Sequence, residues 1–250
     1  MKTRLDQRLV ALGLAESRSR AKAAIEAGGV TVDGAMARAA SQLVPEDAVV
    51  TYADAHQWVG RGALKLDHAL TLWPVAVEGR VVLDVGASTG GFTEVCLTGG
   101  AARVFAVDVG SAQMHARVAA DPRVVNLEQT DARILNRDLI PQAPQLIVCD
   151  ASFIGLAKVL PAALGLAAPD ADLVTLVKPQ FEATGPGGSK KGVVKDPGAR
   201  QAALASVSGW LETRGWTVME TTESPITGSD GNMEYLLWAR SGPQPPRCKG

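Results

Sequence analysis

The stretch from Val81 to Glu94, VVLDVGASTGGFTE, combines an apolar run, a glycine-rich turn and the start of a helix. The run Val81–Val85 predicts a strand that is buried on both faces, as in parallel sheets. Gly86 and the pair Gly90-Gly91 allow a tight turn and a close approach of the backbone to a ligand. Open α/β sheets bind ligands beyond the carboxyl ends of their strands. The stretch therefore predicts an α/β domain with a binding site at this turn.

The glycine turn also limits the kind of ligand. It is not the Gly-x-Gly-x-x-Gly fingerprint of dinucleotide-binding folds, and no Gly-Lys-Ser/Thr follows to make a phosphate loop. The turn also lacks a basic residue that would support a pyrophosphate. Such a turn suits a ligand without phosphates, and we expect S-adenosylmethionine.

Acids after the neighbouring strands extend the predicted cofactor site. Asp108 follows the second strand, 22 positions after Gly86, where an acid can accept hydrogen bonds from ribose hydroxyls. Asp131 follows the third strand, where it could bind the adenine amino group. The alternative is that both acids only cap helices. The residues predicted to bind the cofactor are Asp84, Gly86, Ser88, Gly90, Gly91, Phe92, Asp108, Asp131 and Asp150.

Strand and helix patterns alternate through most of the chain after residue 80. This alternation predicts a mostly parallel, seven-stranded sheet with helices on both faces. Residues 224–232 join the last two strands without a helical pattern, so we expect this pair to be antiparallel. The predicted strands are Val81–Val85, Val104–Val107, Val124–Leu127, Leu146–Cys149, Leu173–Val177, Thr217–Glu220 and Tyr235–Ala239.

The first 54 residues predict a separate small, α-rich domain. Leu5, Leu9 and Leu12 have helical spacing, and a second helix begins at Ser17. A short strand with an Asp-Gly turn follows at 30–34. Seven basic and four acidic residues among the first 38 give a local excess of +3. We expect a linker at 55–62, a second domain at 63–240 and a flexible, proline-rich tail at 241–250.

Composition narrows the class of protein. The 250 residues have a net charge of -1, so any surface for nucleic acid must be local. Three cysteines and three histidines show no metal-ligand spacing, and we expect no metal site and no disulfide framework. The start of the chain lacks the apolar core of a signal peptide. The most apolar helical stretch, Phe153 to Ala168, is broken by Lys158 and Pro161 and is too short to span a bilayer. We expect a soluble, cytoplasmic protein that does not bind membranes.

Four charged residues gather at the predicted carboxyl edge of the sheet. Asp150 ends the fourth strand, Lys178 follows the fifth, Glu234 precedes the last, and Lys65 lies just before the sheet begins. Each residue could also have an ordinary structural role instead of a functional one. Lys65 and Lys178 could be solvated cations, Asp150 could cap a helix, and Glu234 could be a surface charge.

In order and context these four residues match a Lys-Asp-Lys-Glu tetrad, and the second domain resembles the FtsJ-like RNA 2′-O-ribose methyltransferases that carry it. With the first domain, the chain resembles ribosomal RNA methyltransferases of the TlyA, or hemolysin A, type. The first domain is similar to the small RNA-binding domain of a ribosomal small-subunit protein and many pseudouridine synthases. Trp58-Val59 matches the interdomain linker of that family, whereas His56-Gln57 departs from it. The resemblance runs from about Thr3 to Arg240.

The resemblance implies a Rossmann-like class I methyltransferase that uses S-adenosylmethionine to methylate a cytidine ribose 2′-hydroxyl of ribosomal RNA. A ribose hydroxyl must lose its proton as it attacks the methyl group, and a neutral lysine amine can accept that proton. We expect Lys178 to be this base, since Lys65 and burial favour its neutral form. Asp150 would orient Lys178, and Glu234 would hold Lys65 and the ribose.

Ribosomal RNA or ribosomal subunits are the expected partners. The predicted RNA-binding residues are Arg4, Arg18, Arg20, Lys22, Lys190 and Lys191. The last two lie in the glycine-rich stretch 181–197, which we expect to be a mobile loop near the active site or an ordinary surface loop. Three other functions stay open at this stage: a non-catalytic ribosome-binding or assembly factor, a small-molecule O-methyltransferase, and a membrane-active haemolysin.

Overall fold

The computed structural model describes residues 2–182, 192–228 and 230–242. The chain divides into two compact units, residues 1–58 and 59–250, and this division falls within the predicted linker 55–62. The predicted tail lies almost entirely outside the described residues, as do Lys190 and Lys191.

The first unit is a small α/β fold. Leu5 and Leu9 of α1 pack with Ala21, Ala24 and Ile25 of α2 in a core of their own. The predicted helices and the strand at 30–32 are confirmed, whereas four other short strands were not predicted. A strand of three residues is too short for its alternation to be recognised. The elements are β1 (Lys2–Arg4), α1 (Leu5–Ala11), α2 (Arg18–Glu26), β2 (Val30–Val32), β3 (Ala35–Met36), β4 (Leu43–Pro45) and β5 (Val50–Tyr52).

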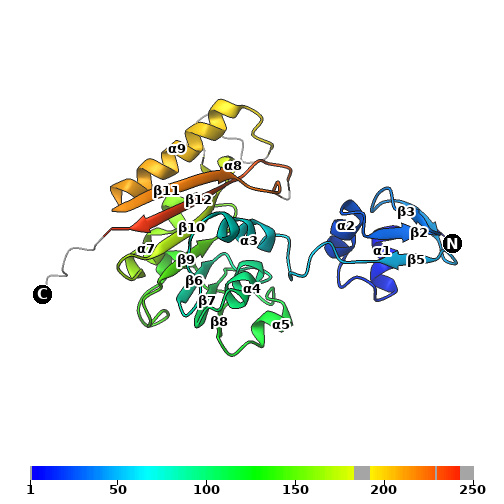
Figure 1. The fold of residues 1–250 in the computed structure, drawn as a ribbon, viewed down its shortest axis with the longest axis horizontal. Coiled ribbons are helices and arrows are strands. Elements are labelled where there is room, and N and C mark those ends of the chain that lie inside the picture. The colour runs from blue at the N-terminus through cyan, green and yellow to red at the C-terminus, as the bar shows by residue number, and fades with distance from the viewer. Residues whose placement is uncertain (1, 183–191, 229, 243–250) are drawn as a thin grey trace, which may run out of the picture. The chain divides into compact units, whose positions relative to one another are not determined.

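The second unit contains the predicted seven-stranded sheet (Figure 1). The strand order is β11-β12-β10-β9-β6-β7-β8, and β6 to β10 pair in parallel. The last strand, β12, is antiparallel to both of its neighbours, as expected. The strands are β6 (Val81–Val85), β7 (Arg103–Val107), β8 (Val124–Leu127), β9 (Leu146–Cys149), β10 (Asp172–Val177), β11 (Trp216–Glu223) and β12 (Tyr235–Ser241).

Helices cover both faces of this sheet. Alternation along β6 sends Leu83 and Val85 into the core formed with α6, α7 and α9, and sends Asp84 toward α4 on the other face. The predicted helical stretch 153–168 forms two short helices, because Pro161 begins a new helix at its first turn. The helices are α3 (Ala63–Leu72), α4 (Gly91–Thr98), α5 (Ala116–Ala119), η1 (Ala132–Ile134), α6 (Leu156–Val159), α7 (Pro161–Leu166), α8 (Pro179–Glu182) and α9 (Pro197–Thr213).

The chain order of the strands reverses between β6 and β9, which are hydrogen-bonded neighbours. Such a switch point opens a crevice at the carboxyl ends of the strands. Gly86 follows β6 and Asp150 follows β9, so both lie at this crevice. Across the described ranges, no helix combines the length and apolar character needed to cross a membrane.

Candidate active site

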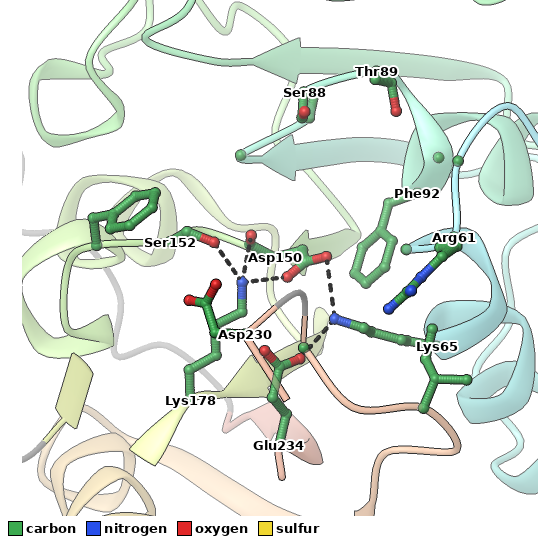
Figure 2. A pocket seen from close by; sticks show the side chains of 18 of the residues that line it. Arg61, Lys65, Ser88, Thr89, Phe92, Asp150, Ser152, Lys178, Asp230 and Glu234 are labelled. Atoms are coloured by element: carbon green, nitrogen blue, oxygen red, sulfur yellow. Dashed lines mark hydrogen bonds and ion pairs between the residues drawn. The ribbon is translucent and has the colours of Figure 1, made fainter. Parts of the chain in front are cut away.

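A cavity of about 270 Å³ lies at the switch point, beyond the carboxyl ends of β6, β9 and β10 (Figure 2). Its walls combine the glycine turn, the start of α3, the ends of β9 and β10, and the segment before β12. All four tetrad residues line it. The other lining residues are Gly60, Arg61, Gly62, Gly86, Ala87, Ser88, Thr89, Gly91, Phe92, Ser152, Phe153, Gln180, Phe181, Ile226, Gly228 and Asp230.

The glycine turn has the close backbone packing that its sequence predicts. Gly86 has a φ of +84°, and a Cβ atom there would lie 2.9 Å from the Cα of Ala151. Only glycine combines this left-handed conformation with this approach. Asp108 braces the turn by accepting hydrogen bonds from the backbone N–H groups of Ser88 (2.8 Å) and Gly110 (2.7 Å).

Asp84 is fully buried beneath the turn. Its Oδ2 accepts a hydrogen bond of 2.7 Å from the Thr93 hydroxyl, whereas its Oδ1 has no partner among the described residues. Burial raises the pKa of this carboxyl to about 7. Because Asp84 does not line the cavity, its carboxyl supports the start of α4 from within the fold.

The predicted cofactor residues divide into two groups. Gly86, Ser88, Gly91, Phe92 and Asp150 line the cavity, whereas Asp84, Gly90, Asp108 and Asp131 do not. Hydrogen bonds from the Arg133 guanidinium hold the pKa of the Asp131 carboxyl at about 2, and its side chain also caps the short helix η1. The capping alternative is therefore observed for Asp131, and its contact with adenine stays a prediction.

The tetrad forms a continuous chain of charges in the cavity (Figure 2). Lys65 Nζ on α3 lies 2.6 Å from Glu234 Oε2 and 3.9 Å from Asp150 Oδ2. Lys178 Nζ lies 2.6 Å from Asp150 Oδ1. Asp150 thus sits between the two lysines. Lys65, Lys178 and Glu234 are all buried, so these charges are shielded from solvent and depend on one another.

Lys178 has a further neighbour that the sequence analysis missed. Its Nζ lies 2.7 Å from Ser152 Oγ and 3.1 Å from the carbonyl oxygen of Asp150. Ser152 comes two positions after Asp150, in the loop that leaves β9, so its place at a strand end was the available signal. Arg61, another missed residue, lines the cavity and donates a hydrogen bond of 3.2 Å to the Thr227 carbonyl.

The predicted RNA-binding arginines of the first unit differ in their surroundings. Arg4 and Arg18 are largely exposed, and each forms an ion pair of 3.0 Å with the buried Asp6. Hydrogen bonds from Arg4, which have the larger effect, and from Arg18 lower the pKa of Asp6 to about 2. Arg20 is mostly buried and pairs with Asp54 at 2.8 Å. Lys22 is exposed and lies 3.6 Å from Glu26.

Fold and site together define a class I methyltransferase, and comparisons with known proteins agree. A model of the FtsJ-like methyltransferase family matches residues 58–241, and a model of the S4 domain matches residues 3–50. The Mycobacterium tuberculosis protein named 16S/23S rRNA (cytidine-2′-O)-methyltransferase TlyA is 46% identical over 96% of this chain and 90% of its own length.

Solved structures show the same architecture. A protein from Streptococcus thermophilus, 33% identical, covers 98% of this chain and 90% of its own with a TM-score of 0.75. An S-adenosylmethionine-dependent methyltransferase from Mesorhizobium loti, 18% identical, covers 72% of this chain and 98% of its own with a TM-score of 0.53, and this likeness concerns the fold alone. The chain belongs to the FtsJ-like methyltransferase family, in the TlyA-type group that joins this domain to an S4 domain.

Proposed function

We propose that this chain transfers a methyl group from S-adenosylmethionine to the ribose 2′-hydroxyl of a cytidine in ribosomal RNA. The observation that carries the proposal is the convergence of Lys65, Asp150, Lys178 and Glu234 in one cavity. The relative from Mycobacterium tuberculosis, which is named for this activity, supports the choice of substrate. Ribosomal RNA as the substrate implies that the protein works in the cytoplasm.

The residues around the glycine turn suit S-adenosylmethionine. Gly86, Ser88, Gly91 and Phe92 would contact it from the cavity wall, and Asp84 would support the turn from below through its hydrogen bond with Thr93. Asp108 would hold the turn and contact the ribose. When bound, this cofactor supplies a methyl group on a positively charged sulfur, which leaves as a neutral thioether.

The tetrad supplies alignment and a proton acceptor. Lys178 in its neutral form would take the proton of the ribose hydroxyl. Asp150 orients Lys178 through their ion pair, and Lys65 lies on the other side of the same carboxylate. Glu234 holds Lys65 in place. Because methyl transfer needs an in-line approach, this positioning contributes several kcal/mol, on the order of 7 or more in well-aligned systems.

The S4 unit would bind the RNA backbone. Arg4 at the end of β1 and Arg18 and Lys22 on α2 present cations to solvent, where they suit phosphate contacts. Lys190 and Lys191, which lie outside the described residues, are proposed to add contacts from the methyltransferase unit. Binding through phosphates should weaken as the salt concentration rises.

The direct test uses labelled S-adenosylmethionine, ribosomal subunits that lack the modification, and the Lys178→Ala variant. Wild-type protein should label the RNA, and the variant should label it at least about 10²-fold more slowly while it binds the cofactor equally well. Lys158→Ala, which removes an exposed lysine of α6, serves as the matched control and should be active. Cofactor binding without transfer to any subunit or free ribosomal RNA would instead favour a non-catalytic assembly factor.

A further inference from the structure

Lys178 lines the cavity but is nearly enclosed by oxygen atoms. The residue is 5% exposed, and three oxygens surround its Nζ: Asp150 Oδ1 at 2.6 Å, Ser152 Oγ at 2.7 Å and the Asp150 carbonyl at 3.1 Å. Lys178 donates hydrogen bonds to Ser152 Oγ and to the Asp150 carbonyl, and its contact with Asp150 Oδ1 is an ion pair. The ammonium form is therefore held on three sides by oxygens.

The neutral amine that the reaction needs has two N–H bonds and one lone pair. The carboxylate and the carbonyl of Asp150 accept hydrogen bonds but cannot donate them. The Ser152 hydroxyl can do both, because it has one proton and two lone pairs. When Lys178 loses its proton, its lone pair is therefore best satisfied by turning toward the Ser152 O–H.

Ser152 is also the most exposed residue of this set, so a substrate can touch it most easily. Ser152 is exposed, whereas Lys178 beside it is buried, although both line the cavity (Figure 2). We propose that Ser152 is a catalytic residue that relays the proton of the ribose 2′-hydroxyl to Lys178. The inference rests on the proposed function and adds the path by which the proton leaves.

The atoms balance in one concerted step. The ribose oxygen forms a bond to the methyl carbon as the carbon–sulfur bond breaks, and its O–H proton passes to Ser152 Oγ. The original Ser152 proton passes to the lone pair of Lys178 Nζ, which becomes an ammonium. Serine ends the step unchanged, and the ammonium regains the two hydrogen bonds and the ion pair seen in the structure.

The experiment compares Ser152→Thr with Ser152→Val, because these variants share a shape and differ in the hydroxyl group. Ser152→Ala is a third variant, and Ser206→Ala, at an exposed position of α9, is the control. The rate of methyl transfer to ribosomal subunits is measured in single turnovers from pH 6 upward, until the rate no longer rises with pH; this constant rate is the plateau rate. The dissociation constants of cofactor and RNA are measured as well.

The relay predicts that the plateau rate of S152V falls by about 10²-fold while S152T keeps most of the rate and both ligands bind normally. S152A should also be slow at the plateau. If Ser152 only holds Lys178, the slow variants regain the wild-type rate at the plateau, where the amine is neutral. Equal plateau rates for S152T and S152V, or a wild-type plateau for S152A, would overturn the relay. An inactive wild type would instead refute the proposed function.

Discussion

Asp150 is the residue on which the site depends most, because it touches both lysines. One carboxylate between two buried cations leaves a net positive charge in the cavity. Glu234 offsets this charge through its contact of 2.6 Å with Lys65. The site therefore contains an extended ion network, in which removal of one member leaves a partner buried without compensation.

The Lys65–Glu234 pair allows stability to be separated from catalysis. Glu234→Leu should lower the free energy of unfolding by up to about 3–5 kcal/mol, since it leaves the buried Lys65 ammonium with only its longer contact of 3.9 Å to Asp150. The double variant with Lys65→Met should recover most of that loss and yet be inactive in methyl transfer. Denaturant unfolding and transfer assays check both results. If the double variant were no more stable than Glu234→Leu alone, the charges of Lys65 and Glu234 would not compensate each other.

Asp84 gives a prediction about pH. Its folded pKa is about 7 and its ordinary value 3.8, so the folded state keeps a proton that the unfolded state releases near pH 4. Stability should therefore fall as pH rises from about 4 to 7, by roughly 4 kcal/mol at most, and then stay constant.

Asp84→Asn removes this titration. The unfolding free energies of the wild type and of Asp84→Asn, measured without cofactor, should be similar near pH 4.5, and the variant should be more stable at pH 8. A wild type that gains stability relative to the variant as pH rises would contradict the raised pKa.

At the scale of elements, the prediction of a cofactor site rests on the glycine turn between β6 and α4. Gly86→Ala and Gly79→Ala both place a side chain at positive φ, +84° and +70°, but only Gly86 has backbone within 4 Å of the new Cβ. Gly79→Ala should cost about 1 kcal/mol of stability. Gly86→Ala should cost about 1–3 kcal/mol more and weaken cofactor binding at least about tenfold. Calorimetry measures both, and equal effects of the two variants would contradict the close approach.

The long elements of this fold were predictable and the short ones were not. Buried runs such as Leu146–Cys149 and Leu173–Val177 mark their strands, because a parallel sheet leaves no polar face. The strands of the S4 unit have two or three residues and are fixed by tertiary pairing instead. The tetrad was found through spacing and resemblance. Ser152 was missed, since only the folded chain shows that it contacts Lys178.

At the scale of the whole molecule, binding and chemistry are assigned to units with separate cores. Asp6→Ala should weaken RNA binding several-fold, because Arg4 and Arg18 lose the carboxylate that orders them. Cofactor affinity should not change. Asp47→Ala removes the same charge at an exposed site and should slightly strengthen RNA binding. Filter binding over a range of salt measures both, and stronger binding by Asp6→Ala would contradict the positioning role.

The central claim is that the methyl group goes to a ribose hydroxyl. The most direct measurement is mass spectrometry of nucleosides from ribosomal RNA treated with the wild-type protein and isotopically labelled S-adenosylmethionine. The account predicts 2′-O-methylcytidine, with the label on the sugar fragment and at a linkage that resists alkaline cleavage. Label on a base fragment, or at a linkage that alkali still cleaves, would contradict it.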